Sequence, residues 1–185
     1  MNISEKIDLC VKRYEDVKNI KLVSEDTGIP WQTVYWYLKK AKINVTGNKS
    51  LYGSTVDRFA AKGEEYISVI LPSAEDQNQI YFQPKIDFFI KGYGLEIKSS
   101  KLDMTYNRWA FSLKKQKKVA DYFILLAFDI QGEEVIHHFL IPNELVIPTL
   151  QTISISKNID NSKWRDFLIN KEELIDFFEN NLEPL

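Results

Sequence analysis

The pattern of apolar and polar positions along the first 45 residues predicts a small helical unit. Apolar residues recur near helical spacing in three short segments, which cover residues 5–14, 17–24 and 30–40. In the third segment, Val34 and Leu38 lie one helical turn apart and are expected to face a common core. The chain therefore opens with three predicted helices.

A different pattern follows residue 55, where helical and strand periodicities occur in turn. We expect helices over 55–71, 106–119 and 171–180, and strands over 122–128, 135–141 and 152–156. The segment 122–128 is apolar throughout, which is typical of a strand buried on both faces. These elements predict an α/β domain with a mixed sheet flanked by helices.

The two patterns are separated by a polar stretch that contains Gly47 and Gly53, which indicates a linker. The expected organisation is a helical arm over 1–45, a linker over 46–54 and an α/β domain over 55–185. A chain of 185 residues is long enough for such a domain with a small appendage.

Residues 84–99 predict a β-hairpin, because two short alternating segments flank a glycine-containing turn. Pairing about this turn is expected to place Asp87 opposite Lys98 and Phe89 opposite Glu96. Since side chains alternate with period two, Asp87, Glu96 and Lys98 share one face, and the other face is apolar. These three groups can form a site for a divalent cation beside a phosphodiester. The alternative is a cross-strand ion pair that contributes under about 1 kcal/mol.

The hairpin also carries a resemblance to a known family. Asp87, an eight-residue gap and the triplet Glu96-Ile97-Lys98 resemble the PD-(D/E)xK nuclease superfamily, although Pro84 stands three residues before Asp87 rather than directly before it. The superfamily includes many type II restriction endonucleases, Holliday-junction resolvases and some homing endonucleases. The resemblance implies a restriction-endonuclease-like core in which Asp87, Glu96 and the Ile97 carbonyl hold Mg²⁺, with Mn²⁺ as a substitute. Lys98 would contact the scissile phosphate and the attacking water.

Two further positions fit the motifs of this superfamily. Glu64, at the edge of the apolar stripe of the helix predicted over 55–71, is expected to be an additional metal or water ligand, with Glu65 as the second choice. The alternative for either residue is a solvated surface acid. Gln116, in the helix predicted over 106–119, is expected to orient the water or bind phosphate.

The segment from Leu22 to Val34 resembles a helix-turn-helix DNA-binding motif, with Gly28 in the turn and Val34 buried in the second helix. In that motif the second helix enters the major groove. The residues expected to contact DNA are Trp31, Gln32, Thr33, Tyr35, Trp36, Lys39 and Lys40. The alternative is a three-helix cap whose aromatic residues pack on the following domain.

The charge distribution favours one basic face rather than a basic molecule. The chain has a net charge of −2, yet residues 98–118 carry seven Lys or Arg against one acid, whereas 119–185 carry four against twelve. A single cysteine, Cys10, excludes a disulfide framework and suits the cytoplasm, and no apolar run approaches a membrane span. His137 and His138 are adjacent and should point to opposite faces of a strand.

Together these features predict a Mg²⁺-dependent, sequence-specific DNA endonuclease, most simply a type II restriction enzyme. Cutting both strands of a duplex with one site per chain would require a homodimer or a second binding event, and a two-fold dimer favours a palindromic target. The alternatives are a homing endonuclease, a junction resolvase whose arm serves dimerisation, and a non-catalytic DNA-binding regulator.

Overall fold

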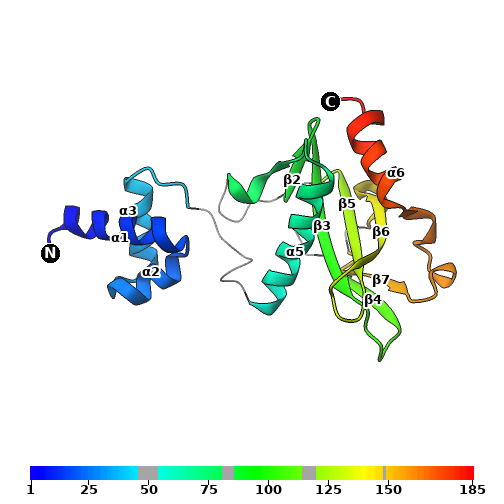
Figure 1. The fold of residues 1–185 in the computed structure, drawn as a ribbon, viewed down its shortest axis with the longest axis horizontal. Coiled ribbons are helices and arrows are strands. Elements are labelled where there is room, and N and C mark those ends of the chain that lie inside the picture. The colour runs from blue at the N-terminus through cyan, green and yellow to red at the C-terminus, as the bar shows by residue number, and fades with distance from the viewer. Residues whose placement is uncertain (46–53, 81–85, 114–119, 148) are drawn as a thin grey trace.

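The computed structural model describes residues 1–45, 54–80, 86–113, 120–147 and 149–185. Its first part is a bundle of three helices, α1 (Ile3–Val17), α2 (Ile20–Thr27) and α3 (Trp31–Lys40), drawn in blue in Figure 1. The bundle has a hydrophobic core of its own, to which all three helices contribute. The three helices predicted from the sequence are confirmed, and Val34 and Leu38 are fully buried as expected.

Side-chain caps and one glycine determine where these helices begin and end. Asn2 and Glu5 form a capping box that starts α1 two residues earlier than the apolar pattern predicts. Asn19 accepts hydrogen bonds from the first backbone N–H groups of α2. Gly28 ends α2 with a φ of +67°, and nothing lies within 4 Å of the position that a Cβ would take there. The positive φ alone therefore explains the glycine between α2 and α3.

The rest of the chain contains a six-stranded sheet of order β1-β2-β3-β5-β6-β8, a two-stranded sheet of β4 and β7, and helices. Its elements are α5 (Thr55–Ile70), β1 (Glu75–Asp76), η1 (Gln77–Gln79), β2 (Phe88–Ile90), β3 (Tyr93–Lys101), β4 (Arg108–Ser112), β5 (Tyr122–Phe128), β6 (Val135–Pro142), η2 (Asn143–Leu145), β7 (Thr152–Ser156), η3 (Ile159–Asn161), η4 (Arg165–Phe167), β8 (Leu168–Ile169), α6 (Lys171–Asp176) and η5 (Phe177–Asn181). Strands β3 and β5 pair in parallel, whereas the other neighbours in the sheet are antiparallel. The predicted mixed sheet, with β5 as an inner buried strand, is confirmed. Within the described ranges no helix has the length and apolar character needed to cross a membrane.

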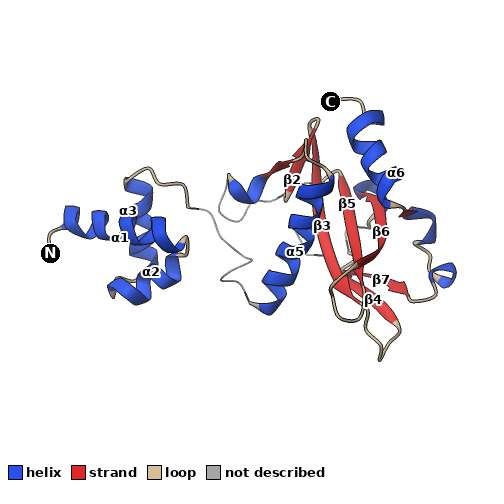
Figure 2. Ribbon diagram, viewed as in Figure 1, coloured by secondary structure: helices blue, strands red, loops and turns tan. Residues whose placement is uncertain are grey.

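The six-stranded sheet is covered differently on its two faces (Figure 2). One face of β5, with Ile124 and Leu126, packs against α5 and α6 in one hydrophobic core. The opposite face, with Phe123 and Leu125, packs against β4, β7 and the turns that follow β7. The domain therefore has three layers, helices on sheet on a small second sheet, and β5 is apolar at every position because both of its faces are covered.

The prediction of a helix over 106–119 is wrong for the described residues, 106–113. Arg108–Ser112 forms strand β4, in which Trp109 and Phe111 are buried and their neighbours are exposed. This alternation, with Leu113 continuing it, has period two and not the period of a helix. The end of the predicted helix lies outside the described residues, and so does Gln116.

The hairpin of β2 and β3 is confirmed, but its register differs from the prediction by two residues. The turn consists of Lys91 and Gly92, both with positive φ (51° and 93°), which is typical of a two-residue type I′ turn. Phe89 therefore pairs with Gly94 rather than with Glu96, and the expected pairing of Asp87 with Lys98 is wrong. A shift of two residues preserves the alternation of faces, so the assignment of side chains to the two faces is unaffected.

The C-terminal segment fixes this turn. The Lys91 ammonium donates to the backbone carbonyls of Glu179 and Leu182, at 2.8 and 3.1 Å, and so satisfies carbonyls at the end of the last helix. In return the Leu185 N–H donates to the Lys91 carbonyl at 3.0 Å. The hairpin is thus held at its tip as well as along its strands.

Helix α5 crosses β3 closely at Gly63. A Cβ at this position would lie 2.0 Å from Ser99 Oγ and 3.3 Å from Leu126 Cδ1, so any larger residue would require the Ser99 side chain or the helix to move. Val56, in the first turn of this helix, is 77% exposed.

The two adjacent histidines of β6 face opposite layers, as expected. The His138 imidazole Nε2 and the Tyr66 hydroxyl of α5 share a hydrogen bond of 2.8 Å on the helical side. His137 lies against the Trp109 ring on the other side. Burial lowers the pKa of His138 to about 4, with smaller contributions from the neighbouring His137 and Lys171.

We predict that His138 makes the domain sensitive to mild acid. Its folded-state pKa of about 4 lies below the ordinary value of 6.5, so the stability from the neutral ring is present above pH 6.5 and is lost as the pH falls toward 4. Between pH 7 and pH 5 this loss is about 2 kcal/mol. Urea unfolding at both pH values should show a smaller pH dependence in a His138→Gln protein, and an equal pH dependence would contradict the assignment.

Candidate active site

The Asp87 carboxylate lies at the edge of β3 and takes the place of a strand partner. Strand β2 begins at Phe88, and the Asp87 N–H donates to the Leu95 carbonyl at 3.1 Å. One step further along β3, the Ile97 N–H donates to Asp87 Oδ2 at 2.8 Å. Asp87 is only 9% exposed, so its carboxylate is fixed against the backbone of the Glu96-Ile97-Lys98 triplet.

Glu96 and Lys98 lie on the same face of β3 and form an ion pair with each other. Their side chains are 22% and 20% exposed, respectively, so the pair is largely shielded from water. The face that they share is the one covered further along by β4 and β7, since Glu96 pairs with Phe123 of the apolar layer beneath that small sheet. Two carboxylates and an ammonium are therefore gathered at one end of this face, as the sequence predicts.

The backbone of Ile97 faces the same edge as Asp87. In a strand the N–H and C=O of one residue point to the same side, and alternate residues point to opposite sides. The Ile97 N–H points toward Asp87, and the Gly94 carbonyl points to the β5 side, where it accepts from the Asp121 N–H. The Ile97 carbonyl consequently opens toward the edge where the Asp87 carboxylate lies.

Glu64 approaches from the other layer. It lies on α5, on the side toward β1 and β2, because its Oε2 accepts a hydrogen bond of 3.1 Å from Asn78 of η1. Asn78 follows Gln77, whose N–H donates to the Asp87 carbonyl at 2.9 Å, so short links connect Glu64 to the Asp87 segment. Glu65 is exposed. In the part of the chain that the structure describes, no group of three or more His, Cys, Asp or Glu residues is close enough to form a metal cluster.

The 3-10 helix η1 contributes to this site although no periodic pattern in the sequence predicts it. Gln77 is 5% exposed, and Asn78 holds Glu64, yet neither residue belongs to a periodic pattern. The only signal was the polar run from Asp76 to Gln79 ahead of the hairpin, where the Asp76 carboxylate accepts from the Asn78 N–H. Such a local turn can be predicted, but its position beside the hairpin depends on the tertiary fold.

The residues expected to contact DNA lie on α3 with different exposures. Trp31 and Trp36 are 49% and 55% exposed, whereas Tyr35 is half-buried and packs against the core of the bundle. Lys39 and Lys40 are exposed at the end of the helix, and their ammonium groups lie over the rings of Tyr35 and Trp36, respectively. Gln32 is exposed and Thr33 half-buried in the first turn. Helix α3 thus presents an aromatic and basic surface.

Comparison with solved structures gives a weak similarity to a bacterial homing endonuclease. No family model matches this chain, and no curated protein matches it. Among solved structures, a bacterial homing endonuclease is similar with a TM-score of 0.44 and 11% sequence identity, over 72% of this chain and 96% of that chain.

We predict that Asp87 has a structural role that can be separated from its chemistry. An Asp87→Ala protein should lose about 1–3 kcal/mol of stability, because the Ile97 N–H is left without its acceptor. An Asp87→Asn protein keeps a carbonyl oxygen at this place and should lose clearly less. Denaturant unfolding of the two variants checks this order, and equal losses would show that the hydrogen bond to Ile97 does not hold the strand edge.

Proposed function

We propose that this protein is a Mg²⁺-dependent DNA endonuclease with a restriction-endonuclease-like core and with Asp87, Glu96 and Lys98 as its catalytic residues. The observation that carries the proposal is the hydrogen bond of 2.8 Å between Asp87 Oδ2 and the Ile97 N–H. It holds one carboxylate against the residue that lies between the second carboxylate and the lysine. The sequence motif implies that Asp87 lies beside the Glu96-Ile97-Lys98 triplet. The hairpin brings them together in a register that differs by two residues from the predicted one.

The burial of these groups favours a function over a purely structural ion pair. Asp87 is almost fully buried and the Glu96–Lys98 pair is about four-fifths buried. Removing charged groups from water costs free energy that their attraction often fails to repay, so an apolar pair here would stabilise the fold at least as well. Partly buried, interacting ionisable groups at a strand edge are instead typical of a chemical site.

The donor set suits a hard divalent cation. Asp87, Glu96 and the Ile97 carbonyl would hold Mg²⁺ or Mn²⁺ through oxygen atoms, and Glu64 would join from α5 directly or through water. The remaining coordination positions of the ion would be taken by water and by phosphate oxygens. When bound, the ion supplies positive charge at the phosphate and acidifies a bound water.

Lys98 would supply a positive charge from the protein itself, in addition to that of the metal ion. Its ammonium is held beside Glu96 and directed along the face that carries both carboxylates. From there it would donate hydrogen bonds to a non-bridging oxygen of the scissile phosphate and to the attacking water. Charge that develops on the phosphate in the transition state is stabilised by such a positioned cation.

Helix α3 would provide recognition of the duplex. Trp31, Gln32 and Trp36 lie on its exposed side, where Gln can read base edges and the aromatic rings can pack on sugars or thymine methyl groups. Lys39 and Lys40 would contact phosphates at its end. The short α2–α3 connection through Gly28 suits a helix-turn-helix motif.

Cleavage of both strands requires two active sites. We therefore propose that the protein acts as a homodimer on a palindromic target, in the manner of a type II restriction endonuclease.

Incubation of the protein with phage genomic DNA at low salt, with Mg²⁺ or with EDTA, tests the proposal. We expect discrete fragments with Mg²⁺, none with EDTA, and a loss of at least 100-fold in rate for Lys98→Ala, in line with the loss of a transition-state donor. Mapping of the fragment ends would then give the target sequence.

A Lys171→Ala protein is the matched control, since Lys171 begins α6 on the far side of the sheet from Lys98. It should cleave at the wild-type rate. Unchanged cleavage by Lys98→Ala, or cleavage that persists in EDTA, would refute the proposed site.

A further inference from the structure

The outward face of the small β4–β7 sheet is polar and carries no acid. Its inward side chains, among them Trp109 and Ile155, are buried in the domain core. The side chains that alternate with these point outward, and they are Arg108, Ala110, Ser112, Thr152, Ser154 and Ser156. One arginine is thus set among small side chains, four of them hydroxyl-bearing.

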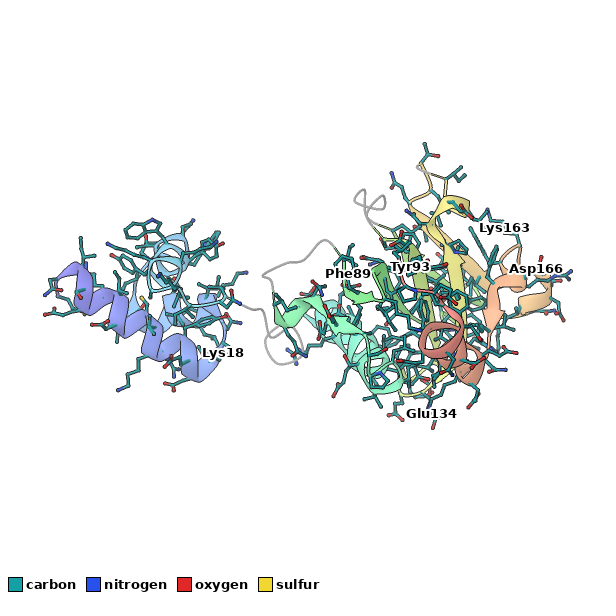
Figure 3. All side chains as sticks on the ribbon, turned by 90° about the horizontal axis from the view of Figure 1, so that it is seen from above. Lys18, Phe89, Tyr93, Glu134, Lys163 and Asp166 are labelled. Atoms are coloured by element: carbon teal, nitrogen blue, oxygen red, sulfur yellow. The ribbon has the colours of Figure 1, made fainter. Side chains whose placement is uncertain are left out.

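A groove lies at the Arg108 end of this face. It has a volume of about 430 Å³ and is lined by residues of β4, β7, the loop before β4 and the segment from the end of η3, including Tyr106, Asn161 and Lys163. Among the described residues that line the groove, two are cationic and none is acidic. Lys163 lies at the periphery of the domain in Figure 3, and both cations are exposed.

The two cations are held by their neighbours. The Arg108 guanidinium lies 5.0 Å from the centre of the Tyr106 ring, and its Nη1 donates to Ser154 Oγ at 3.4 Å. The Lys163 ammonium lies 4.9 Å from the centre of the Trp164 ring. Such contacts with aromatic rings orient a cation without neutralising it.

Of the two acids nearest in sequence to this face, Asp160 is exposed and is not among the residues that line the groove, and Asp103 is engaged in its own loop. Asp103 precedes β4, and its Oδ1 accepts hydrogen bonds from the N–H groups of Thr105 and Tyr106 at 2.8 and 3.3 Å. Its carboxylate is therefore turned into its own loop. It is not among the residues that line the groove.

We propose that this groove, with the adjoining hydroxyl-bearing face of β4–β7, binds phosphates of a DNA backbone. Arginine, lysine, serine, threonine and asparagine are the side chains that hold phosphate oxygens in protein–DNA interfaces, and they position a duplex without reading its sequence. The inference rests on the proposed function for the identity of DNA as the partner.

The position of β4 connects the groove to the candidate active site. The Ala110 N–H donates to Ser100 Oγ at 3.0 Å, so β4 lies against the face of β3 that carries Glu96 and Lys98. The groove lies at the Arg108 end of β4, where Arg108 pairs with Asp103, five residues beyond Lys98 or about 17 Å along the strand direction. A duplex held by Arg108 and Lys163 would therefore run on the side of the sheet that carries Glu96 and Lys98.

The salt dependence of DNA binding tests the assignment. Binding of a labelled duplex would be measured by fluorescence anisotropy between 50 and 300 mM KCl, in an Asp87→Asn background that cannot cleave under the proposed mechanism. Arg108→Gln and Lys163→Gln should each lower the slope of log K against log salt by about 0.9, because each removes one phosphate contact.

Arg165→Gln is the control, since Arg165 is exposed, lies outside the groove and is paired with Asp166. We expect it to keep the parent slope. If the two groove variants keep the salt slope of the parent protein, or if Arg165→Gln lowers the slope equally, the groove is not a phosphate-binding site. The cleavage experiment would be unaffected by either result. Absence of DNA binding by the parent protein, together with absence of cleavage by the wild type, would overturn both proposals.

Discussion

The hydrogen bond between the Ile97 N–H and the Asp87 carboxylate is the contact on which the candidate site depends. Strand β2 contains only three residues, so the edge of β3 beyond Leu95 is not paired by the backbone of β2. A backbone N–H left without an acceptor in this buried position would cost about 1–3 kcal/mol. The carboxylate satisfies this group and is at the same time fixed beside Glu96 and Lys98, so one interaction supports both the stability of the strand edge and the proposed site.

The layered architecture explains why the site has its particular surroundings. Helices α5 and α6 pack on one face of the sheet, and β4–β7 packs on the other. Glu96 and Lys98 lie on the β4–β7 face, and their side chains are about one-fifth exposed. Glu64 comes from the helical layer and reaches the β1–β2 edge through Asn78, so two layers contribute to the surroundings of Asp87.

Much of this arrangement could be predicted from the sequence, for identifiable reasons. The continuous apolar run of β5 and the alternation of the hairpin depend on local periodicity, and both are confirmed. The hairpin register could not be predicted, because a tight turn could be centred on either Gly92 or Gly94. The turn at Lys91 and Gly92 is supported by hydrogen bonds from Lys91 to the C-terminal segment, which is distant in sequence. The face shared by Asp87, Glu96 and Lys98 could still be predicted, because a shift of two residues keeps every side chain on its face. The strand β4 was missed because the basic residues that follow Leu113 suggested an exposed helix, although Trp109 and Phe111 alternate with period two.

Binding of Mn²⁺, followed by electron paramagnetic resonance in the absence of DNA, tests the central claim most directly, because it isolates the ligands from recognition and cleavage. The account predicts that the wild-type protein binds Mn²⁺, and that Asp87→Asn and Glu96→Gln each weaken this binding by at least about tenfold, the effect expected when a ligand is lost. Asp166→Asn, which changes an exposed acid of η4, should bind as the wild type does. Equal Mn²⁺ affinity in all four proteins would contradict the assignment of Asp87 and Glu96 as metal ligands.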